Sequence, residues 1–250
     1  MVRSVVRLRW FLLCVIVFSH GCERASAPTD DAAIERVGLE SENGKAAPQQ
    51  AAPTPPTSAI ADPQPGRFRL VMVGDSITAG FGLPAPEALP VKLQSALDEQ
   101  RCAITIVNAG VSGDTTADGL NRFGWSVDPD ADGVLIALGG NDLLQGIAPD
   151  QTRANLAAMI EKAKARDLQV ILAGMRAPGN YGTTFQDRFD AIFPDLAATY
   201  DIALYPFLLE GVGAVPSLNQ PDGIHPNRQG VAKITDAVST FLCDTVKAMQ

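Results

Sequence analysis

The fold of this chain is decided by the sequence RLVMV at residues 69–73 and by GDSITAG, which follows it at residues 74–80. The first segment is short, apolar and β-prone, and it predicts a buried strand. The second places Ser76 between glycines that permit a tight turn from a strand into a helix. In a parallel sheet, reactive groups lie in the loops beyond the carboxyl ends of strands, and Ser76 is at such a position.

The remainder of the chain alternates between strand-like and helix-like patterns. Further strands are predicted at 104–107, 133–138, 169–173 and 203–208, and helices at 88–100, 150–167, 185–200 and 231–246. Pro194 is expected to kink or split the third of these helices. Alternation of this kind predicts an α/β fold, with right-handed βαβ units and a mostly parallel sheet covered by helices on both faces.

Composition limits the class of protein. The chain has 250 residues, of which 46% are hydrophobic and 19% charged, and these values predict a globular protein. The formal net charge of −8 argues against a nucleic-acid partner, which would require a clustered basic face. One domain over residues 67–250 accounts for all the predicted elements.

The first 22 residues have the pattern of a secretory signal. Three arginines precede an apolar run over 10–18, and Gly21 then precedes Cys22. This end resembles a bacterial lipoprotein cleavage site, at which Cys22 would be lipidated. Cleavage after the small residues at 25–27, with soluble release, is the alternative. Both predict an exported protein, located in the periplasm and, if lipidated, tethered to a membrane.

Residues 23–66 are expected to form a disordered tether. Seven of the chain's 18 prolines lie in this acidic, alanine-rich segment, and it contains no aromatic residue. A segment of this composition cannot bury enough apolar surface to offset the entropy lost on ordering.

A histidine, an acid and a serine are candidates for nucleophilic catalysis. His20 belongs to the signal, so His225 is the single imidazole of the predicted domain. Asp222 lies three residues earlier in a glycine-containing turn, close enough to orient that ring and leave its other nitrogen to accept a proton from Ser76. The structural alternatives are that Ser76 caps a helix, Asp222 caps a turn, and His225 opens the last helix.

Two further glycine-containing loops follow predicted strands, and they offer donors for a developing oxyanion. Gly113 supplies an unobstructed backbone N–H, and Asn141 supplies a neutral amide. Asp114 and Asp142, in the same loops, are expected to cap helices.

The residues present do not favour metal, phosphate-binding, glycosidase or cysteine chemistry. One histidine and two distant cysteines do not make a zinc site, and the glycine spacing fits neither phosphate-binding fingerprint. No pair of carboxylates suggests glycoside hydrolysis. A cysteine nucleophile is disfavoured because neither Cys102 nor Cys243 lies in a loop that follows a predicted strand. In an oxidising compartment these two residues form either a disulfide or two buried thiols, and both readings stay open.

Taken in order, GDSITAG, VSGDTT, GGND and DGIHPN resemble the four blocks of the SGNH (GDSL-type) hydrolases. The resemblance covers the domain from about residue 67 and is greatest to the bacterial periplasmic arylesterases, acyl thioesterases and lysophospholipases. It implies a flavodoxin-like three-layer sandwich with about five parallel strands, and no cofactor. It also implies a catalytic triad of Ser76, Asp222 and His225, and an oxyanion hole formed by Ser76, Gly113 and Asn141.

The resemblance extends to residues 175–182, which correspond to a mobile loop that contacts the acyl chain. Asn180, Tyr181 and Gly182 are therefore candidate substrate contacts. Ile224, directly before His225, is a further candidate. Ile77 and Ala177 stand where leucine is common, a difference that affects pocket shape rather than chemistry.

The sequence thus predicts a monomeric serine esterase that hydrolyses carboxylic (acyl or aryl) esters. Its partners would be a small-molecule ester or lipid, with a membrane reached only through the anchor at Cys22. Lysophospholipase or acyl thioesterase activity is the alternative, followed by a carbohydrate O-acetyl esterase and by a non-catalytic tethered binding module.

Overall fold

A computed structural model describes residues 66–250 of the chain. The predicted signal at 1–22, the lipidation site at Cys22 and the tether at 23–66, apart from Gly66, lie outside the described residues.

The core of the fold is a sheet of five parallel strands in the order β2-β1-β3-β4-β5. The strands are β1 (Phe68–Gly74), β2 (Ile104–Gly110), β3 (Gly133–Ala137), β4 (Gln169–Ala173) and β5 (Ala203–Tyr205). This order is that of flavodoxin-like proteins. The predicted α/β class, strand number and parallel arrangement are confirmed.

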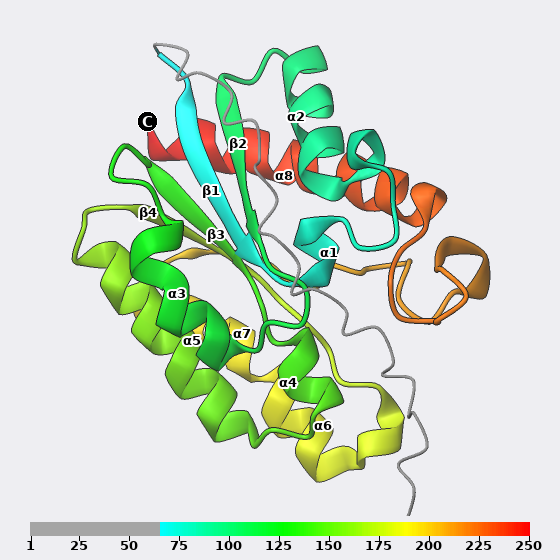
Figure 1. Ribbon diagram of the computed structural model, residues 1–250. Coiled ribbons are helices and arrows are strands. Elements are labelled where there is room, and N and C mark those ends of the chain that lie inside the picture. Colours follow the sequence, from blue (N-terminus) through cyan, green and yellow to red (C-terminus); the bar gives the residue numbers. More distant parts are fainter. Residues whose placement is uncertain (1–65) are drawn as a thin grey trace, which may run out of the picture. The chain divides into compact units, whose positions relative to one another are not determined.

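Helices cover both faces of the sheet. They are α1 (Ser76–Ala79), α2 (Leu89–Glu99), α3 (Thr116–Ser126), α4 (Gly140–Leu144), α5 (Pro149–Lys164), α6 (Thr183–Asp190), α7 (Ile192–Tyr200) and α8 (Arg228–Met249). Helix α2 packs on α8, and α3 packs on α5, which contacts α7. Figure 1 shows α8 crossing behind β1, whereas α3 and α5 lie on the viewer's side. No helix of the described part is long and apolar enough to span a membrane.

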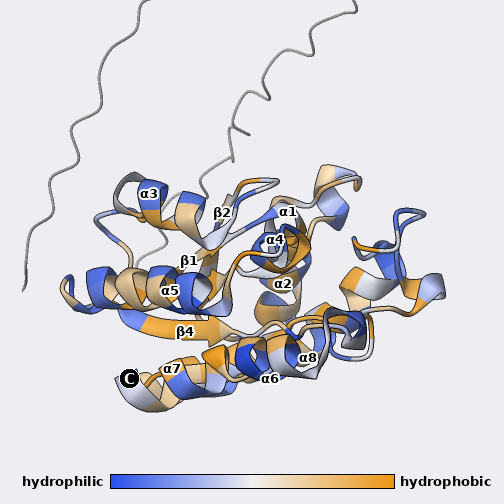
Figure 2. Cartoon of the chain, turned by 90° about the horizontal axis from the view of Figure 1, so that it is seen from below, coloured by the Kyte–Doolittle hydropathy of each residue, from blue (hydrophilic) through white to orange (hydrophobic). Residues whose placement is uncertain are grey.

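The buried strands explain why the sheet forms. Every residue of β1 and β3 is buried, as a central strand covered on both faces requires. Figure 2 shows β4 as a largely hydrophobic strand between two layers of helices. The arrowheads in Figure 1 point toward α1 and α4, so the carboxyl ends of the strands lie along one edge of the sheet.

Two elements differ from the sequence-based expectation. Helix α3 was expected only from the cap assigned to Asp114, and no range was predicted for it, because Gly119 and Gly124 weaken its helical pattern. Gly119 is required by packing, since a Cβ there would lie 2.3 Å from Cδ1 of Leu138. The predicted helix over 185–200 is split at Ala191 rather than at Pro194. Pro194 lacks the N–H that would bond residue 190, and its ring crowds that carbonyl, so the break falls one turn earlier.

The structure joins Cys102 and Cys243 as a disulfide, with their Cα atoms 5.7 Å apart. Cys102 precedes β2, and Cys243 lies in the buried face of α8. The bond ties the C-terminal helix to the sheet across 141 residues of sequence.

Candidate active site

The structure brings Ser76, His225 and Asp222 into one chain of hydrogen bonds. Nε2 of His225 lies 2.8 Å from Oγ of Ser76, and Nδ1 lies 2.7 Å from Oδ2 of Asp222. Ser76 begins α1 directly beyond β1, whereas the other two residues lie in the loop before α8. This is the geometry of a nucleophile, a base and an acid that orients the base.

The turn that carries Ser76 depends on close packing of glycine. A Cβ on Gly74 would lie 2.0 Å from Oγ1 of Thr78, and a Cβ on Gly110 would lie 2.4 Å from the backbone N of Ala79. Strands β1 and β2 can therefore end against α1 only because both positions lack a side chain. The close approach holds the first residue of this four-residue helix at the sheet edge.

Asp75 supplies the cap of α1 and is itself buried. Its Oδ1 accepts the N–H of Ile77 at 3.0 Å, so the predicted capping role falls to Asp75 rather than Ser76. Burial raises the pKa of Asp75 from 3.8 to about 6, although the N–H of Ile77 and the nearby His225 lower it. No feature of the sequence pointed to a role for this carboxyl beyond the turn that contains it.

The loop that carries His225 is organised by Asp222. Oδ1 of Asp222 accepts the N–H groups of Ile224 at 2.9 Å and of His225 at 3.0 Å. These two bonds, together with the bond from the imidazole, lower the pKa of Asp222 from 3.8 to about 2. The carboxylate thus both caps the turn and bonds the imidazole, so the structural and the catalytic interpretation of Asp222 are compatible.

Phe81 and Gln220, which no sequence pattern pointed to, contact the histidine or its loop. The ring of Phe81 lies 4.6 Å from the imidazole of His225, centroid to centroid. Nε2 of Gln220 donates to the carbonyl oxygens of Phe81 at 2.8 Å and Pro226 at 3.1 Å. One amide side chain therefore connects the segment after α1 to the histidine loop.

The candidate oxyanion donors lie at the starts of α1 and α4 and in the loop between β2 and α3. Gly113 has φ +92° and open space where a Cβ would be, so an approaching ligand would meet its backbone unobstructed. Among the described residues, neither its N–H nor that of Ser76 donates to a protein acceptor. Nδ2 of Asn141 donates to the main-chain oxygen of Asp114 at 2.9 Å, which fixes the amide plane and leaves its second N–H unused.

The aspartates of these loops were expected to cap helices. Asp142 does so for a neighbouring helix, because it accepts the N–H of Thr116 at the start of α3 at 2.8 Å. The cap of α3 itself is Thr115, in a capping box with Asp118. Asp114 is instead bonded to Arg122.

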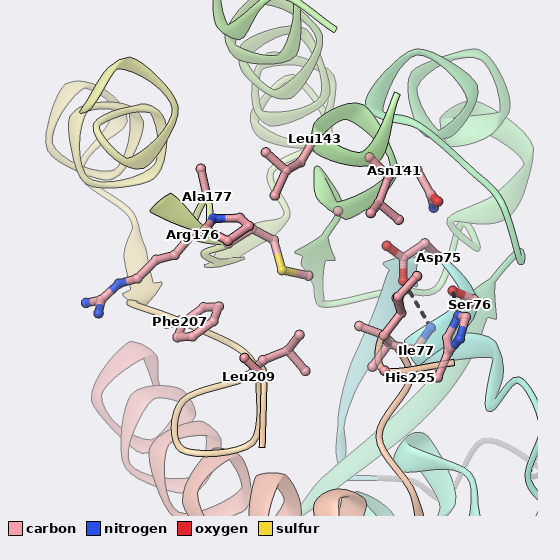
Figure 3. A pocket seen from close by; sticks show the side chains of 18 residues that line it. Asp75, Ser76, Ile77, Asn141, Leu143, Arg176, Ala177, Phe207, Leu209 and His225 are labelled. Carbon is pink, nitrogen blue, oxygen red and sulfur yellow. Dashed lines mark hydrogen bonds between the residues drawn. The ribbon is translucent and has the colours of Figure 1, made fainter. Parts of the chain in front are cut away.

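A pocket of about 460 Å³ opens beside Ser76. Figure 3 shows Ser76, Asp75, Asn141 and His225 on one side of it, and Phe207, Leu209 and Arg176 on the other. Most of the remaining wall is apolar, formed by Ile77, Leu143, Leu144, Met175, Ala177, Pro178, Gly213, Ala214 and Ile224. Such a wall suits a hydrocarbon chain held next to the nucleophile.

The predicted substrate contacts are placed differently from one another. Ile224 lines the pocket, as do residues 175–178 of the predicted acyl loop. Asn180, Tyr181 and Gly182 do not line it, and the ring of Tyr181 stacks on Phe185 at 5.3 Å. The structure therefore brings only the first half of the loop to the pocket.

Several known proteins are similar to this chain in sequence. Residues 72–233 match the GDSL-like Lipase/Acylhydrolase family. Esterase TesA of Pseudomonas aeruginosa is 43% identical over 158 residues, which cover 63% of this chain and 79% of the relative. A protein of Escherichia coli K12 named thioesterase 1/protease 1/lysophospholipase L1 is 39% identical over 168 residues, 67% of this chain and 79% of the relative.

A solved structure shows the same fold. The crystal structure of AlinE4, described as an SGNH-hydrolase family esterase, superposes with a TM-score of 0.60 at 42% identity, covering 74% of this chain and 97% of AlinE4. The resemblance drawn from the four sequence blocks is thereby confirmed. The chain belongs to the GDSL-like lipase/acylhydrolase family and is a carboxylic-ester hydrolase of the SGNH type.

Proposed function

We propose that the domain hydrolyses acyl esters through a covalent intermediate on Ser76. As Oγ of Ser76 forms a bond to the ester carbonyl carbon, its proton passes to Nε2 of His225 and the carbonyl oxygen becomes an oxyanion. Asp222 holds the imidazole and stabilises its charged form. The observation that carries this proposal is the 2.8 Å contact between Ser76 and His225 at the pocket.

The rest of the cycle follows from the same groups. Collapse of the intermediate breaks the ester C–O bond, and the alcohol leaves with the proton from His225. A water molecule then gives its proton to His225 and attacks the acyl-enzyme, which releases the acid and restores the Ser76 hydroxyl. The N–H groups of Ser76 and Gly113 and the amide of Asn141 are the proposed oxyanion donors, each worth about 10²- to 10³-fold in rate.

Labelling by a fluorophosphonate tests the nucleophile directly, because this probe reacts only with an activated serine. The wild type is expected to label, and Ser76→Ala and His225→Ala are expected to remain folded without labelling or esterase activity. Labelling of a folded Ser76→Ala protein would refute the assignment. Absence of labelling in the wild type would favour the non-catalytic binding module.

The substrate we propose is an ester with a medium or long acyl chain. The apolar walls formed by Leu143, Met175, Phe207 and Leu209 support this choice over an acetyl ester of a carbohydrate. The names of the relatives, an esterase and a thioesterase/lysophospholipase, are compatible with it. For an exported enzyme a lysophospholipid is a more accessible substrate than an acyl thioester of the cytosol.

Chain-length dependence distinguishes these substrates. The octanoyl ester of p-nitrophenol should be hydrolysed faster than the acetyl ester, and Leu209→Trp should reduce the octanoyl rate more, because the indole would occupy the pocket opposite Ser76. Tyr181→Ala tests the other half of the acyl loop: a selective loss of octanoyl hydrolysis would place Tyr181 at the chain. Lysophosphatidylcholine and palmitoyl-CoA, assayed in parallel, separate the two lipid activities.

We also propose that the enzyme acts outside the cytoplasm. The signal pattern at 1–22 and the disulfide between Cys102 and Cys243 support this, since disulfides persist in oxidising compartments. Growth with an alkyne-labelled palmitate tests the anchor: incorporation should be lost in Cys22→Ser, and an unlabelled wild type would favour soluble release.

A further inference from the structure

Arg122 is a buried arginine that does not line the pocket. It lies in α3 and is 6% exposed. Each nitrogen of its guanidinium has a partner: Nε donates to Oδ2 of Asp114 at 2.5 Å, Nη2 to the carbonyl of Gly74 at 3.0 Å, and Nη1 to Oγ of Ser126 at 2.9 Å. Burying a guanidinium costs free energy unless its N–H groups are paired, and here each nitrogen has a partner that offsets this cost.

Two of these partners lie next to the reacting atoms. Gly74 is the last residue of β1 and is separated from Ser76 by one residue. Its carbonyl also accepts the N–H of Val111 at 3.0 Å, so the nucleophile turn and the loop of Gly113 are already in contact there. Asp114 directly follows Gly113. One guanidinium therefore joins the segments that present the N–H groups of Ser76 and Gly113.

The third donor is connected through the same aspartate. The main-chain oxygen of Asp114 accepts one N–H of the Asn141 amide at 2.9 Å. The position of Asp114 thus decides where the second N–H of Asn141 points. Because Arg122 holds the side chain of Asp114, it is connected through this residue to the Asn141 amide.

We propose that Arg122 is a positioning residue for the oxyanion hole. It fixes the relative positions of the segments that carry Ser76, Gly113 and Asn141, and it does not touch substrate. This rests on the proposed function. An oxyanion hole acts through donors fixed before the reaction, and a displacement of about 1 Å can cost on the order of 10²-fold in rate. Loss of the guanidinium should therefore weaken binding of the transition state and leave ground-state binding in the apolar pocket unchanged.

The test uses two variants of the purified enzyme. Arg122→Lys keeps the charge beside Asp114, but one ammonium group cannot reproduce the fork that spans Asp114 and Gly74. The double variant Arg122→Met/Asp114→Asn removes both charges, so no unpaired buried charge remains, and it keeps the main-chain oxygen that Asn141 needs. With p-nitrophenyl octanoate, each is expected to lose about 10- to 100-fold in kcat at unchanged KM.

Arg166→Lys is the matched control. Arg166 is half-buried and donates its guanidinium to two main-chain oxygens, those of Val127 at 3.1 Å and Asp128 at 2.7 Å, at the end of α3 away from Gly113. Arg166→Lys should change the melting temperature in the same direction as Arg122→Lys, but it should not lower kcat. Equal kcat losses in the Arg166 and Arg122 variants would mean that general loosening of the fold explains the effect, and would overturn the proposal.

A double-mutant cycle supplies the readout that a purely structural role would not move. If Arg122 acts through the oxyanion hole, Arg122→Lys combined with Asn141→Ala should lose less kcat than the product of the two single losses. Multiplying losses, an effect on KM alone, or unchanged kcat in a folded Arg122 variant would each overturn the proposal. A wild type that fluorophosphonate does not label would instead contradict the proposed function itself.

Discussion

The carboxylate of Asp222 is bonded to His225 twice, through its ring Nδ1 at 2.7 Å and through its backbone N–H at 3.0 Å. The same acid therefore fixes both the imidazole and the turn that carries it. Because the side chain of Asp222 is 37% exposed, its value lies in orienting the ring rather than in net stability.

Asp222→Asn should lower kcat on the order of 10⁴-fold with little change in the melting temperature, because the amide no longer selects the productive tautomer. Since the pKa of Asp222 is about 2, the wild-type carboxylate stays ionised throughout the range above pH 4 and adds no acidic limb there. Steady-state kinetics from pH 4 to 9 checks both points. Asp236→Asn, an exposed aspartate of α8, controls for the lost charge, and a small effect of Asp222→Asn would remove Asp222 from the triad.

Gln220→Glu should lower kcat about tenfold, because a carboxylate cannot donate to the carbonyl oxygens of Phe81 and Pro226. The loss of the donor frees the histidine loop from the segment that follows α1. Gln229→Glu introduces the same charge four residues beyond His225 without breaking a side-chain bond, and kcat should be retained. Comparable losses in both variants would show that charge, not the amide bridge, is responsible.

Asp75→Asn should stabilise the protein at pH 8 and have little effect at pH 4. The pKa of Asp75 is raised from 3.8 to about 6 in the folded state, so this group's contribution is fully present below pH 3.8 and is lost as pH rises through about 6. The loss amounts to up to ~3 kcal/mol, and a neutral amide avoids it while still accepting the N–H of Ile77.

Urea unfolding at the two pH values measures that difference. Asp130→Asn, an exposed position, controls for the change in net charge. Equal unfolding free energies for the wild type and Asp75→Asn at pH 8 would contradict the raised pKa.

Removing the disulfide should cost stability without altering the chemistry. Cys102→Ser/Cys243→Ser opens a loop of 141 residues, and the free energy of unfolding should fall by about 2–5 kcal/mol. The kcat of the folded variant should be unchanged, because neither cysteine lines the pocket. Urea denaturation of the wild type with and without a reductant gives the comparison, and identical midpoints would mean that the bond does not form in solution.

Much of the fold could be predicted because its signals are local. The strand at 169–173 has the predicted bounds, and the other strands lie within a few residues of theirs. No range was predicted for helix α3 because Gly119 and Gly124 weaken its helical pattern, and the contact of Gly119 with Leu138 is one that no local pattern records. The break at Ala191 was displaced from Pro194 because a proline acts on the carbonyl four residues before it.

Some residues of the site could also be predicted from local signals, and others could not. Ser76, Asp222 and His225 could be proposed from residue type and turn chemistry, because each sits beside the glycines or prolines that its loop requires. Arg122 and Gln220 gave no such signal. An arginine in a helix and a glutamine in a loop are ordinary residues until their partners, up to 139 positions away, are known.

The strand pattern, the candidate reactive residues and their order along the chain could be read from local periodicity and backbone preference. The folded structure supplied what these local signals lack. It brought Ser76 within 2.8 Å of His225 across 149 residues, assembled an apolar pocket from separate segments, and placed Arg122 between Gly74 and Asp114. Parallel strands all end at the same edge of the sheet, and their order there is set by packing. No local stretch of sequence encodes that order.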